Sequence, residues 1–300
     1  MTTPQLQIAA TDSPRGSSPA WGGRALGLGA SQLVAYAIVL GGALIMLAPF
    51  YFMFVFATHS DREILSLPPP VWFGPAFVDN LKLLLERLPY FWHNLGWSLY
   101  VALAVTAANL LLCSLAGYAF AMFEFKYKKQ LFVFVMGTML LPSFVAMIPT
   151  ALTMSWLGWM NQPKALIVPA ACGALGIFMM RQYIASAIPR DLLDAARIDG
   201  CGEFGIYFRV VLPLIGPALG TLGLVTFIGS WNNFMGPLIV MRDMEMYTVP
   251  LALRALQGTG QTPWGAICAG SSIAVLPLLV IFMLASRRLI EGLTAGAVKA

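Results

Sequence analysis

Long apolar runs separated by shorter polar segments dominate the chain, and this alternation predicts its architecture. Six runs have about the length that a helix needs to cross a bilayer, and none contains Asp, Glu, Lys or Arg. Only structures that satisfy every backbone polar group internally can span lipid. We therefore predict an all-α polytopic membrane protein with six transmembrane helices. The predicted spans are Leu33–Ala57, Phe91–Phe120, Leu131–Leu152, Ala165–Met180, Leu214–Val240 and Gly265–Ala285.

Composition supports this assignment and excludes several function classes. Of the 300 residues, 59% are hydrophobic and 10% are charged, whereas about a quarter of a soluble domain is charged. Two histidines and four scattered cysteines leave almost no material for a metal site or a catalytic nucleophile. The spans also lack the acidic or basic residue that a proton-coupled transporter is expected to keep in the bilayer. No phosphate-binding P-loop is present in the sequence.

The polar segments set the domain boundaries and the orientation. Residues 1–30, rich in Pro, Ser, Gly and Thr, predict a disordered cytoplasmic tail, because the alternative, a signal peptide, lacks a clear cleavage site. Residues 31–288 form the membrane domain, and residues 289–300 form a cytoplasmic C-terminal tail with an extended or turned path. With both termini inside, twelve of the eighteen Lys and Arg residues lie on the cytoplasmic side, as the positive-inside rule requires.

Two extramembrane segments have amphipathic patterns. Between the first two spans, Phe77, Leu81 and Leu84 mark a short helix expected to lie along the membrane surface. Between the last two spans, the loop Met241–Trp264 either reaches toward an external partner or simply connects the spans.

The loop of residues 184–213, between the fourth and fifth spans, predicts two short helices with a break between them. Pro189 suits a first helical position, and the following Asp191 places negative charge near the positive end of the helix dipole. Gly200 can take a positive φ where the first helix ends. An apolar stripe is expected on the second helix, formed by Phe204, Tyr207, Phe208 and Val211. The pattern fits a docking element, or an interfacial helix lying on lipid headgroups.

The amino-acid sequence of this loop resembles a known signature. Asp194-Ala195-Ala196, then Gly200, then Val210-Val211-Leu212-Pro213 closely resemble the E-A-A–G–I-x-L-P sequence of ABC importer permeases. Asp194 replaces the usual Glu and Val210 the usual Ile, with charge and shape kept. The resemblance implies a type I ABC importer permease fold in which this loop is the cytoplasmic coupling helix, docked in a cleft of the ATPase subunit. The implied contact residues are Asp194, Ala195, Ala196, Asp199, Gly200, Leu212 and Pro213.

Other segments resemble carbohydrate permeases of the maltose-transporter type, with lactose and arabinose-oligomer permeases the most alike. These segments are S-L-A-G-Y-A-F-A at 114–121, F-M-M-R-Q-Y at 178–183, and W-N-N-F at 231–234. The ending G-L-T-A-G-A-V-K at 292–299 is similar to the terminus of the second permease subunit in those systems, where the tail contacts the ATPases. The tail residues implied are Gly292, Leu293, Thr294 and Gly296.

This resemblance implies an assembly in the bacterial inner membrane. The expected partners are a second permease subunit, two copies of a cytoplasmic ATPase that carry ATP and Mg, and an external sugar-binding protein. The chain itself is expected to bind no cofactor or metal and to catalyse no reaction.

Residue chemistry nominates a substrate path, since sugars stack on aromatic rings and hydrogen-bond to amides. Polar residues in spans also hold helices together, which is the alternative role for these positions. The candidates are Asn109, Tyr118, Phe227, Trp231, Asn232 and Asn233.

The predicted function is that of a permease subunit in an ATP-driven carbohydrate importer, forming half of the translocation pathway. One alternative is an importer of a non-sugar ligand such as glycerol phosphate, for which uncharged spans offer no basic cavity. The other is a membrane scaffold with no transport role. The sequence does not name the sugar.

Overall fold

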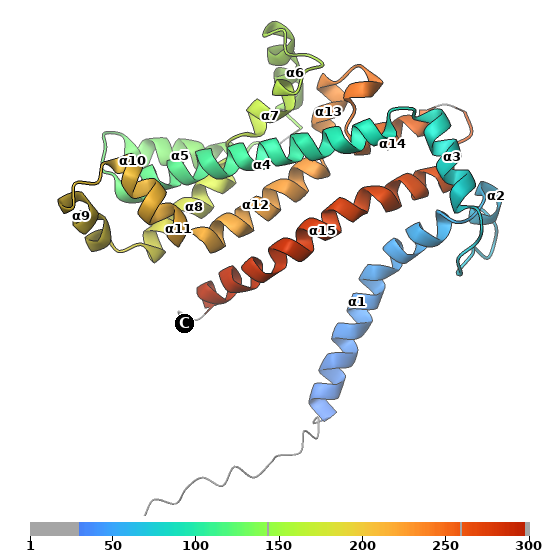
Figure 1. Cartoon of the computed structure of the whole chain (residues 1–300), viewed down its shortest axis with the longest axis horizontal. Coiled ribbons are helices and arrows are strands. Elements are labelled where there is room, and N and C mark those ends of the chain that lie inside the picture. The colour runs from blue at the N-terminus through green and yellow to red at the C-terminus, as the bar shows by residue number, and fades with distance from the viewer. Residues whose placement is uncertain (1–29, 143, 259, 298–300) are drawn as a thin grey trace, which may run out of the picture. The chain divides into compact units, whose positions relative to one another are not determined.

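The computed structural model describes the backbone of residues 30–142, 144–258 and 260–297, with side chains described between 32 and 284. These residues contain helices and no strand, as Figure 1 shows, so the all-α prediction is confirmed for the described chain. The predicted N-terminal tail, apart from its last residue, lies outside the described residues. The longer helices are α1 (Ala30–Phe56), α3 (Phe77–Arg87), α4 (Phe91–Met122), α5 (Lys128–Thr138), α6 (Met147–Trp156), α8 (Ala174–Ala187), α9 (Arg190–Ile198), α12 (Gly216–Trp231) and α15 (Trp264–Ala297). The shorter ones are α2 (Asp61–Ile64), α7 (Lys164–Ala170), α10 (Glu203–Ile206), η1 (Tyr207–Val211), α11 (Leu212–Leu214), α13 (Met235–Val240), η2 (Met244–Met246), α14 (Val249–Ala255) and η3 (Leu256–Gly258).

The chain divides into two compact units, residues 1–49 and residues 50–300. The described part of the first unit is the apolar N-terminal portion of α1. The second unit contains all the other helices and every site discussed below.

Four stretches of the described chain are long and apolar enough to cross a membrane, and a fifth is added if one bent helix pair counts as a span. The four are Gln32–Phe56, Phe91–Met122, Lys164–Ala187 and Trp264–Leu284. The bent pair is Glu203–Leu214 with Gly216–Trp231, which meet at 80°. Six spans are therefore a prediction that the helices support only in part.

The predicted third span, Leu131–Leu152, is not one helix. It is divided between α5 and α6, which residues 139–146 separate. Pro142 lies in this break, and a proline inside a helix lacks the N–H donor and clashes with the preceding turn. A proline inside a span is expected to kink or break the helix, so this break agrees with that expectation although the apolar run continues through it.

The predicted fourth and fifth spans are also interrupted. Residues 171–173 separate α7 from α8, and residues 232–234 separate α12 from α13. Pro169, by contrast, lies within α7, and Pro277 lies within α15. A proline within a span therefore does not by itself decide where a helix breaks.

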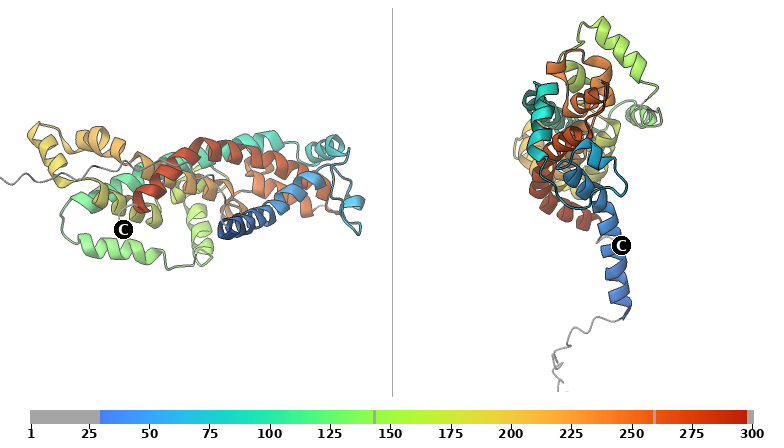
Figure 2. Two further views of the ribbon diagram at one scale, coloured as in Figure 1. Left: turned by 90° about the horizontal axis from the view of Figure 1, so that it is seen from below. Right: turned by 90° about the vertical axis from the view of Figure 1, so that its right-hand side faces the viewer.

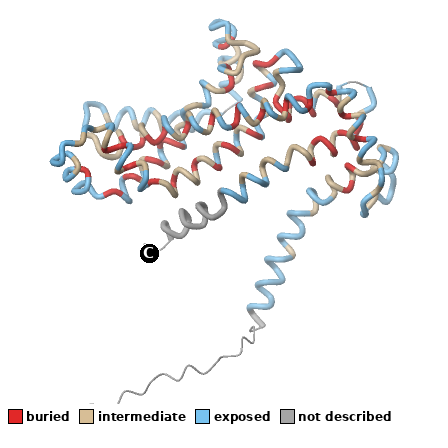
Figure 3. The backbone as a smooth tube through the Cα atoms, viewed as in Figure 1, coloured by how far each residue is buried: buried red, intermediate tan, exposed pale blue. Residues whose placement is uncertain are grey.

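The core of the second unit lies between α4, α8, α12 and α15, and Figure 3 shows buried residues along the facing sides of α4, α8 and α12. Two glycines allow α4 and α8 to approach closely. A Cβ added to Gly117 of α4 would lie 2.5 Å from the Cβ of Met180, and one added to Gly176 would lie 2.7 Å from the Sγ of Cys113. Small residues at such crossings increase van der Waals contact between membrane helices.

The end of this bundle near α3 and α14 is fixed by side-chain amides. Asn94 of α4 donates from Nδ2 to the carbonyls of Met244 and Tyr247, at 2.8 and 2.9 Å. Asn80 of α3 donates to the carbonyls of Ala57 and His59, both at 2.9 Å. The predicted amphipathic helix is thus confirmed as α3, and the loop Met241–Trp264 is partly folded, with α14 buried against the core.

α15 continues through the predicted C-terminal tail to Ala297. The expectation of an extended or turned path was therefore wrong up to that residue. A glycine within a helix costs only about 1 kcal/mol relative to alanine, so Gly292 and Gly296 need not end it.

Candidate functional site

The loop of residues 184–213 lies at the end of the bundle opposite α3 and α14, as Figures 1 and 2 both show. α8 ends at Ala187, and Pro189, extended at ψ 138°, is the N-cap of α9. The proline therefore stands one position before its predicted place. Asp191 falls in the first turn of α9, as the helix-dipole argument requires.

The break between the two short helices is at Gly200, whose φ is +80°. The amide of Gly200 donates to the carbonyl of Arg197 and that of Cys201 to the carbonyl of Ala196, both at 3.0 Å. These bonds satisfy carbonyls that the end of a helix leaves without partners. The prediction of a positive φ at Gly200 is confirmed.

The loop presents an apolar face to its surroundings. Ile198 is 87% exposed and Phe204 is 76% exposed, whereas Leu193 is the only buried residue of α9. Asp194, Ala195, Asp199 and Gly200 are exposed beside them. Large exposed apolar side chains at the turn between two short helices form a surface that a partner or lipid can cover.

The predicted stripe on the second helix is divided. Phe204 and Phe208 are exposed, while Tyr207 and Val211 are buried. Each pair is separated by four residues, so Phe204 and Phe208 share the exposed face as predicted, whereas Tyr207 and Val211 share the face that packs on the core. Residues 207–211 form a π-helical turn within this element.

An ionic cluster joins the two short helices. The Arg197 guanidinium donates to Asp194 at 2.7 Å and to Glu203 at 2.8 Å. The hydrogen bond from Arg197 is the main cause that lowers the pKa of Glu203 below its ordinary value of 4.5. Asp194, in the signature of this loop, is thus paired with Arg197 of the same helix.

Two tyrosines connect the loop to α4. Tyr118 of α4 donates from its hydroxyl to Glu203 at 3.2 Å. Tyr207 is 1% exposed, and its hydroxyl lies 2.7 Å from Oγ of Ser114. Because Ser114 donates its own proton to the carbonyl of Leu110, Tyr207 is the donor in that pair. The loop is thereby fixed to α4 by two hydroxyl groups as well as by apolar packing.

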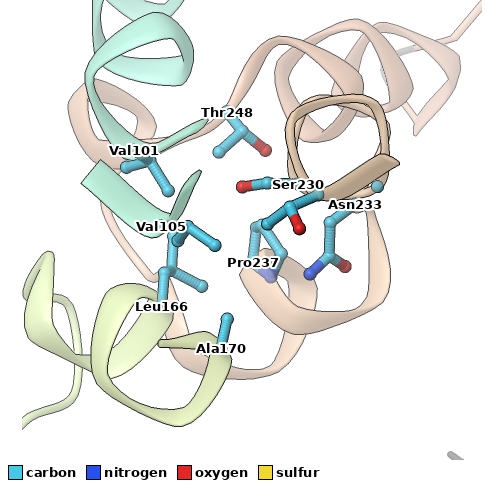
Figure 4. Close-up of a pocket in the computed structure, with 10 residues that line it drawn as sticks. Val101, Val105, Leu166, Ala170, Ser230, Asn233, Pro237 and Thr248 are labelled. Carbon is cyan, nitrogen blue, oxygen red and sulfur yellow. The ribbon is translucent and has the colours of Figure 1, made fainter. Parts of the chain in front are cut away.

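A cavity of about 170 Å³ lies near the other end of the bundle, between α4, α7, α12, α13 and the start of α14 (Figure 4). Its polar lining comes from Thr226, Ser230, Asn233 and Thr248, and its apolar lining includes Val101 and Leu166. No charged residue lines it.

One polar group in this cavity lacks a partner. Thr248 is 3% exposed, and its Oγ1 makes no hydrogen bond within the described chain. The next residue is fixed to α4, because the amide of Val249 donates to Oγ of Ser98 at 2.7 Å. A buried hydroxyl without a partner is costly, so a water or a ligand hydroxyl is favoured beside it.

Comparison with known proteins identifies the family. Residues 113–292 match the family described as "Binding-protein-dependent transport system inner membrane component". The chain belongs to this family. The AraQ permease of the Bacillus subtilis arabinooligosaccharide transport system is 34% identical over 259 residues, covering 86% of this chain and 92% of AraQ.

Other relatives carry different names. The lactose transport system permease LacG of Rhizobium radiobacter is 30% identical, covering 89% of this chain and 96% of LacG. The sn-glycerol-3-phosphate permease UgpE of Salmonella typhi is 27% identical, covering 87% of this chain and 95% of UgpE. A bacterial ABC transporter involved in alginate import has the same fold, with a TM-score of 0.73 at 21% identity over 85% of this chain and 95% of that one. The protein is therefore an inner-membrane permease subunit of an ABC importer and not an enzyme.

The structure separates the six substrate-path candidates of this permease. Asn233 lines the cavity, and Asn109 accepts a hydrogen bond from the cavity residue Thr226 at 3.3 Å. Phe227 and Trp231 are stacked and buried, with ring centroids 5.8 Å apart. Asn232 is exposed and is not among the residues that line the cavity.

Tyr118 does not join these residues, because its hydroxyl bonds to Glu203 under the loop at the far end of the bundle. Sequence reasoning also missed Thr248 and Thr226. The sequence offers no signal for Thr248, since only folding brings the start of α14 against α4.

The other predicted contact residues lie in the loop of residues 184–213 and in the C-terminal tail. Leu212 is half-buried and Pro213 is exposed at the start of the bend into α12. Gly292, Leu293, Thr294 and Gly296 belong to the last turns of α15, and their side chains lie outside the described set.

Proposed function

We propose that this permease transports a carbohydrate and receives the work of ATP hydrolysis through the loop of residues 184–213. The observation that carries the proposal is the exposed corner at Gly200, which presents Ile198 and Phe204 while hydroxyl contacts fix the loop to α4. A partner that moves α9 would therefore move α4 as well. Asp194, Ala195, Ala196, Asp199, Leu212 and Pro213 are the other proposed contacts.

The proposed assembly contains a second permease, two ATPase copies that hold ATP and Mg, and an external sugar-binding protein. In this arrangement six spans cross the inner membrane and both termini are cytoplasmic. Reporter fusions after Lys129 and within residues 190–209 are expected to report the cytoplasm. A fusion near Pro69 is expected to report the outside, and an outside signal from residues 190–209 would contradict the coupling role.

The proposed substrate path includes the cavity and Asn233. Its uncharged lining of hydroxyl, amide and apolar groups suits the hydroxyls and C–H faces of a sugar. A phosphate ester would call for basic residues, and none lines this cavity. The chemistry thus favours a neutral sugar over glycerol phosphate.

The experiment is purification of the whole complex, followed by a sugar panel tested on its binding protein by thermal shift. The sugar that stabilises the binding protein is expected to raise ATP hydrolysis and to enter proteoliposomes. Thr248→Val is expected to raise KM for uptake, while Thr106→Val, whose hydroxyl bonds only within α4, is the control. Stabilisation by glycerol phosphate and by no sugar would overturn the carbohydrate assignment.

A further inference from the structure

A second hollow, of about 560 Å³, lies where α4 ends and α5 begins. We name it the basic hollow. It is lined by Phe120, Glu124, Phe125, Tyr127, Lys128, Lys129, Gln130, Phe132, Val133 and Arg181. Its lining combines a wall of aromatic rings with three cationic side chains, and neither the cavity near Thr248 nor the exposed corner at Gly200 shares a residue with it.

The aromatic wall is built around Phe120 at the end of α4. Its ring centroid lies 5.8 Å from that of Phe125 and 5.4 Å from that of Phe132. The guanidinium of Arg181, from α8, lies over the Phe132 ring at 4.2 Å. This stacking holds the Arg181 charge at the wall, because a planar guanidinium and an aromatic face attract each other.

The hollow has an excess of positive charge. Lys128 forms an ion pair with Glu124 at 3.0 Å. The same Glu124 carboxylate lies 3.6 Å from Arg190 at the start of α9. In the part of the chain that the structure describes, neither Lys129 nor Arg181 makes an ion pair. The hydrogen bond from Lys128 lowers the pKa of Glu124, so this carboxylate is ionised at neutral pH and two positive charges remain uncompensated.

The position of the hollow defines what can reach it. α4 is long and apolar enough to span a bilayer, and it ends at Met122, so residues 123–130 lie where the chain leaves the lipid. Val133, further along α5, is 61% exposed and continues the hollow toward the apolar side. Aromatic and basic side chains together at this depth are typical of the membrane interface, and basic pockets between membrane helices bind anionic headgroups.

We propose that the basic hollow binds one anionic phospholipid. The phosphodiester would lie between Lys129 and Arg181, and an acyl chain would follow the aromatic wall and Val133. A soluble phosphate would gain the charge contacts alone and lose the apolar ones. Because Glu124 joins the hollow to Arg190, the bound headgroup would lie next to the loop of residues 184–213.

The test uses the purified complex in a neutral detergent. Phosphatidylglycerol is titrated into it, with phosphatidylcholine and inorganic phosphate as separate arms, and native mass spectrometry counts bound lipid while thermal shift gives the apparent affinity. We expect one phosphatidylglycerol molecule to be held per permease and to stabilise the complex, with no effect of the other two probes. Equal effects of both lipids, or a phosphate effect equal to that of phosphatidylglycerol, would overturn the proposal.

Variants locate the site. Lys129→Gln with Arg181→Gln is expected to weaken phosphatidylglycerol binding about twenty-five-fold, from roughly fivefold per lost cation. The control, Arg62→Gln with Lys82→Gln, removes the same charge from exposed positions on α2 and α3 and should change binding less than twofold. Lys129→Arg with Arg181→Lys keeps both charges and should restore binding within a few-fold. Undiminished binding by the first pair, or an equal loss in the control pair, would contradict the assignment.

Discussion

Gly200 is the position at which a single substitution tests the loop geometry most sharply. Its φ of +80° is unfavourable for any residue that carries a Cβ. A Cβ added there would meet no atom within 4 Å, so the penalty comes from backbone conformation and not from a clash. That penalty is about 1–2 kcal/mol, lowest for asparagine, which tolerates the left-handed region, and highest for the β-branched valine.

This free-energy penalty lowers the fraction of molecules whose loop has the observed conformation. If the loop can form another turn, 1–2 kcal/mol lowers the fraction in the observed conformation by about five- to thirtyfold. We therefore expect binding-protein-stimulated ATP hydrolysis and uptake to fall in the order wild type, Gly200→Asn, Gly200→Ala, Gly200→Val. The permease is still expected to insert, because the break lies outside the core helices.

The assay is ATP hydrolysis and sugar uptake in proteoliposomes, normalised to the amount of permease by immunoblot. Gly202→Ala is the matched control, since Gly202 has a φ of −70° and equally open surroundings. Wild-type coupling in Gly200→Val would refute the reasoning, as would a loss in Gly202→Ala as large as that in Gly200→Val.

Three further predictions follow from the same end of the molecule. Tyr207→Phe removes a buried hydroxyl partner of Ser114 and is expected to destabilise the complex by about 1 kcal/mol in thermal denaturation; an unchanged Tm would contradict the contact. The pKa of Glu203 is lowered in the folded chain, so the stability that its ion pair with Arg197 gives the loop is complete above pH 4.5 and is lost as pH falls below that value. Proteolysis of the loop should therefore increase in acid, and Glu203→Gln should reduce this pH dependence. Deleting residues 292–300 is expected to leave membrane insertion intact and to weaken ATPase retention on the purified complex, and full retention with full uptake would leave the tail without a role.

The features that the sequence predicted well depend on local rules. Gly200 could be placed because a residue of its kind is needed where a helix ends and the chain turns, and α3 followed from the spacing of its leucines. Both arguments use only neighbours in the chain. The long apolar runs likewise predicted α1, α4 and α15 to within a few residues at their first ends.

The features that it missed depend on tertiary packing. Tyr118 was a sugar candidate by residue type, yet its hydroxyl reaches Glu203, a partner 85 positions away. Thr248 lacks any local signal, because only the packing of α14 against α4 buries its hydroxyl without a partner. Hydropathy also failed to separate α5 from α6, since Pro142 interrupts the helix without interrupting the apolar run.

The central claim is that the exposed corner of the loop docks on an ATPase, and photo-crosslinking tests it most directly. A photoreactive residue is placed at Phe204, which is 76% exposed, and separately at Leu193, which is 1% exposed. The account predicts that the probe at Phe204 crosslinks the permease to the ATPase subunit in the assembled complex and that the probe at Leu193 does not. Crosslinks from Phe204 to lipid alone, with the ATPase present in the complex, would contradict it.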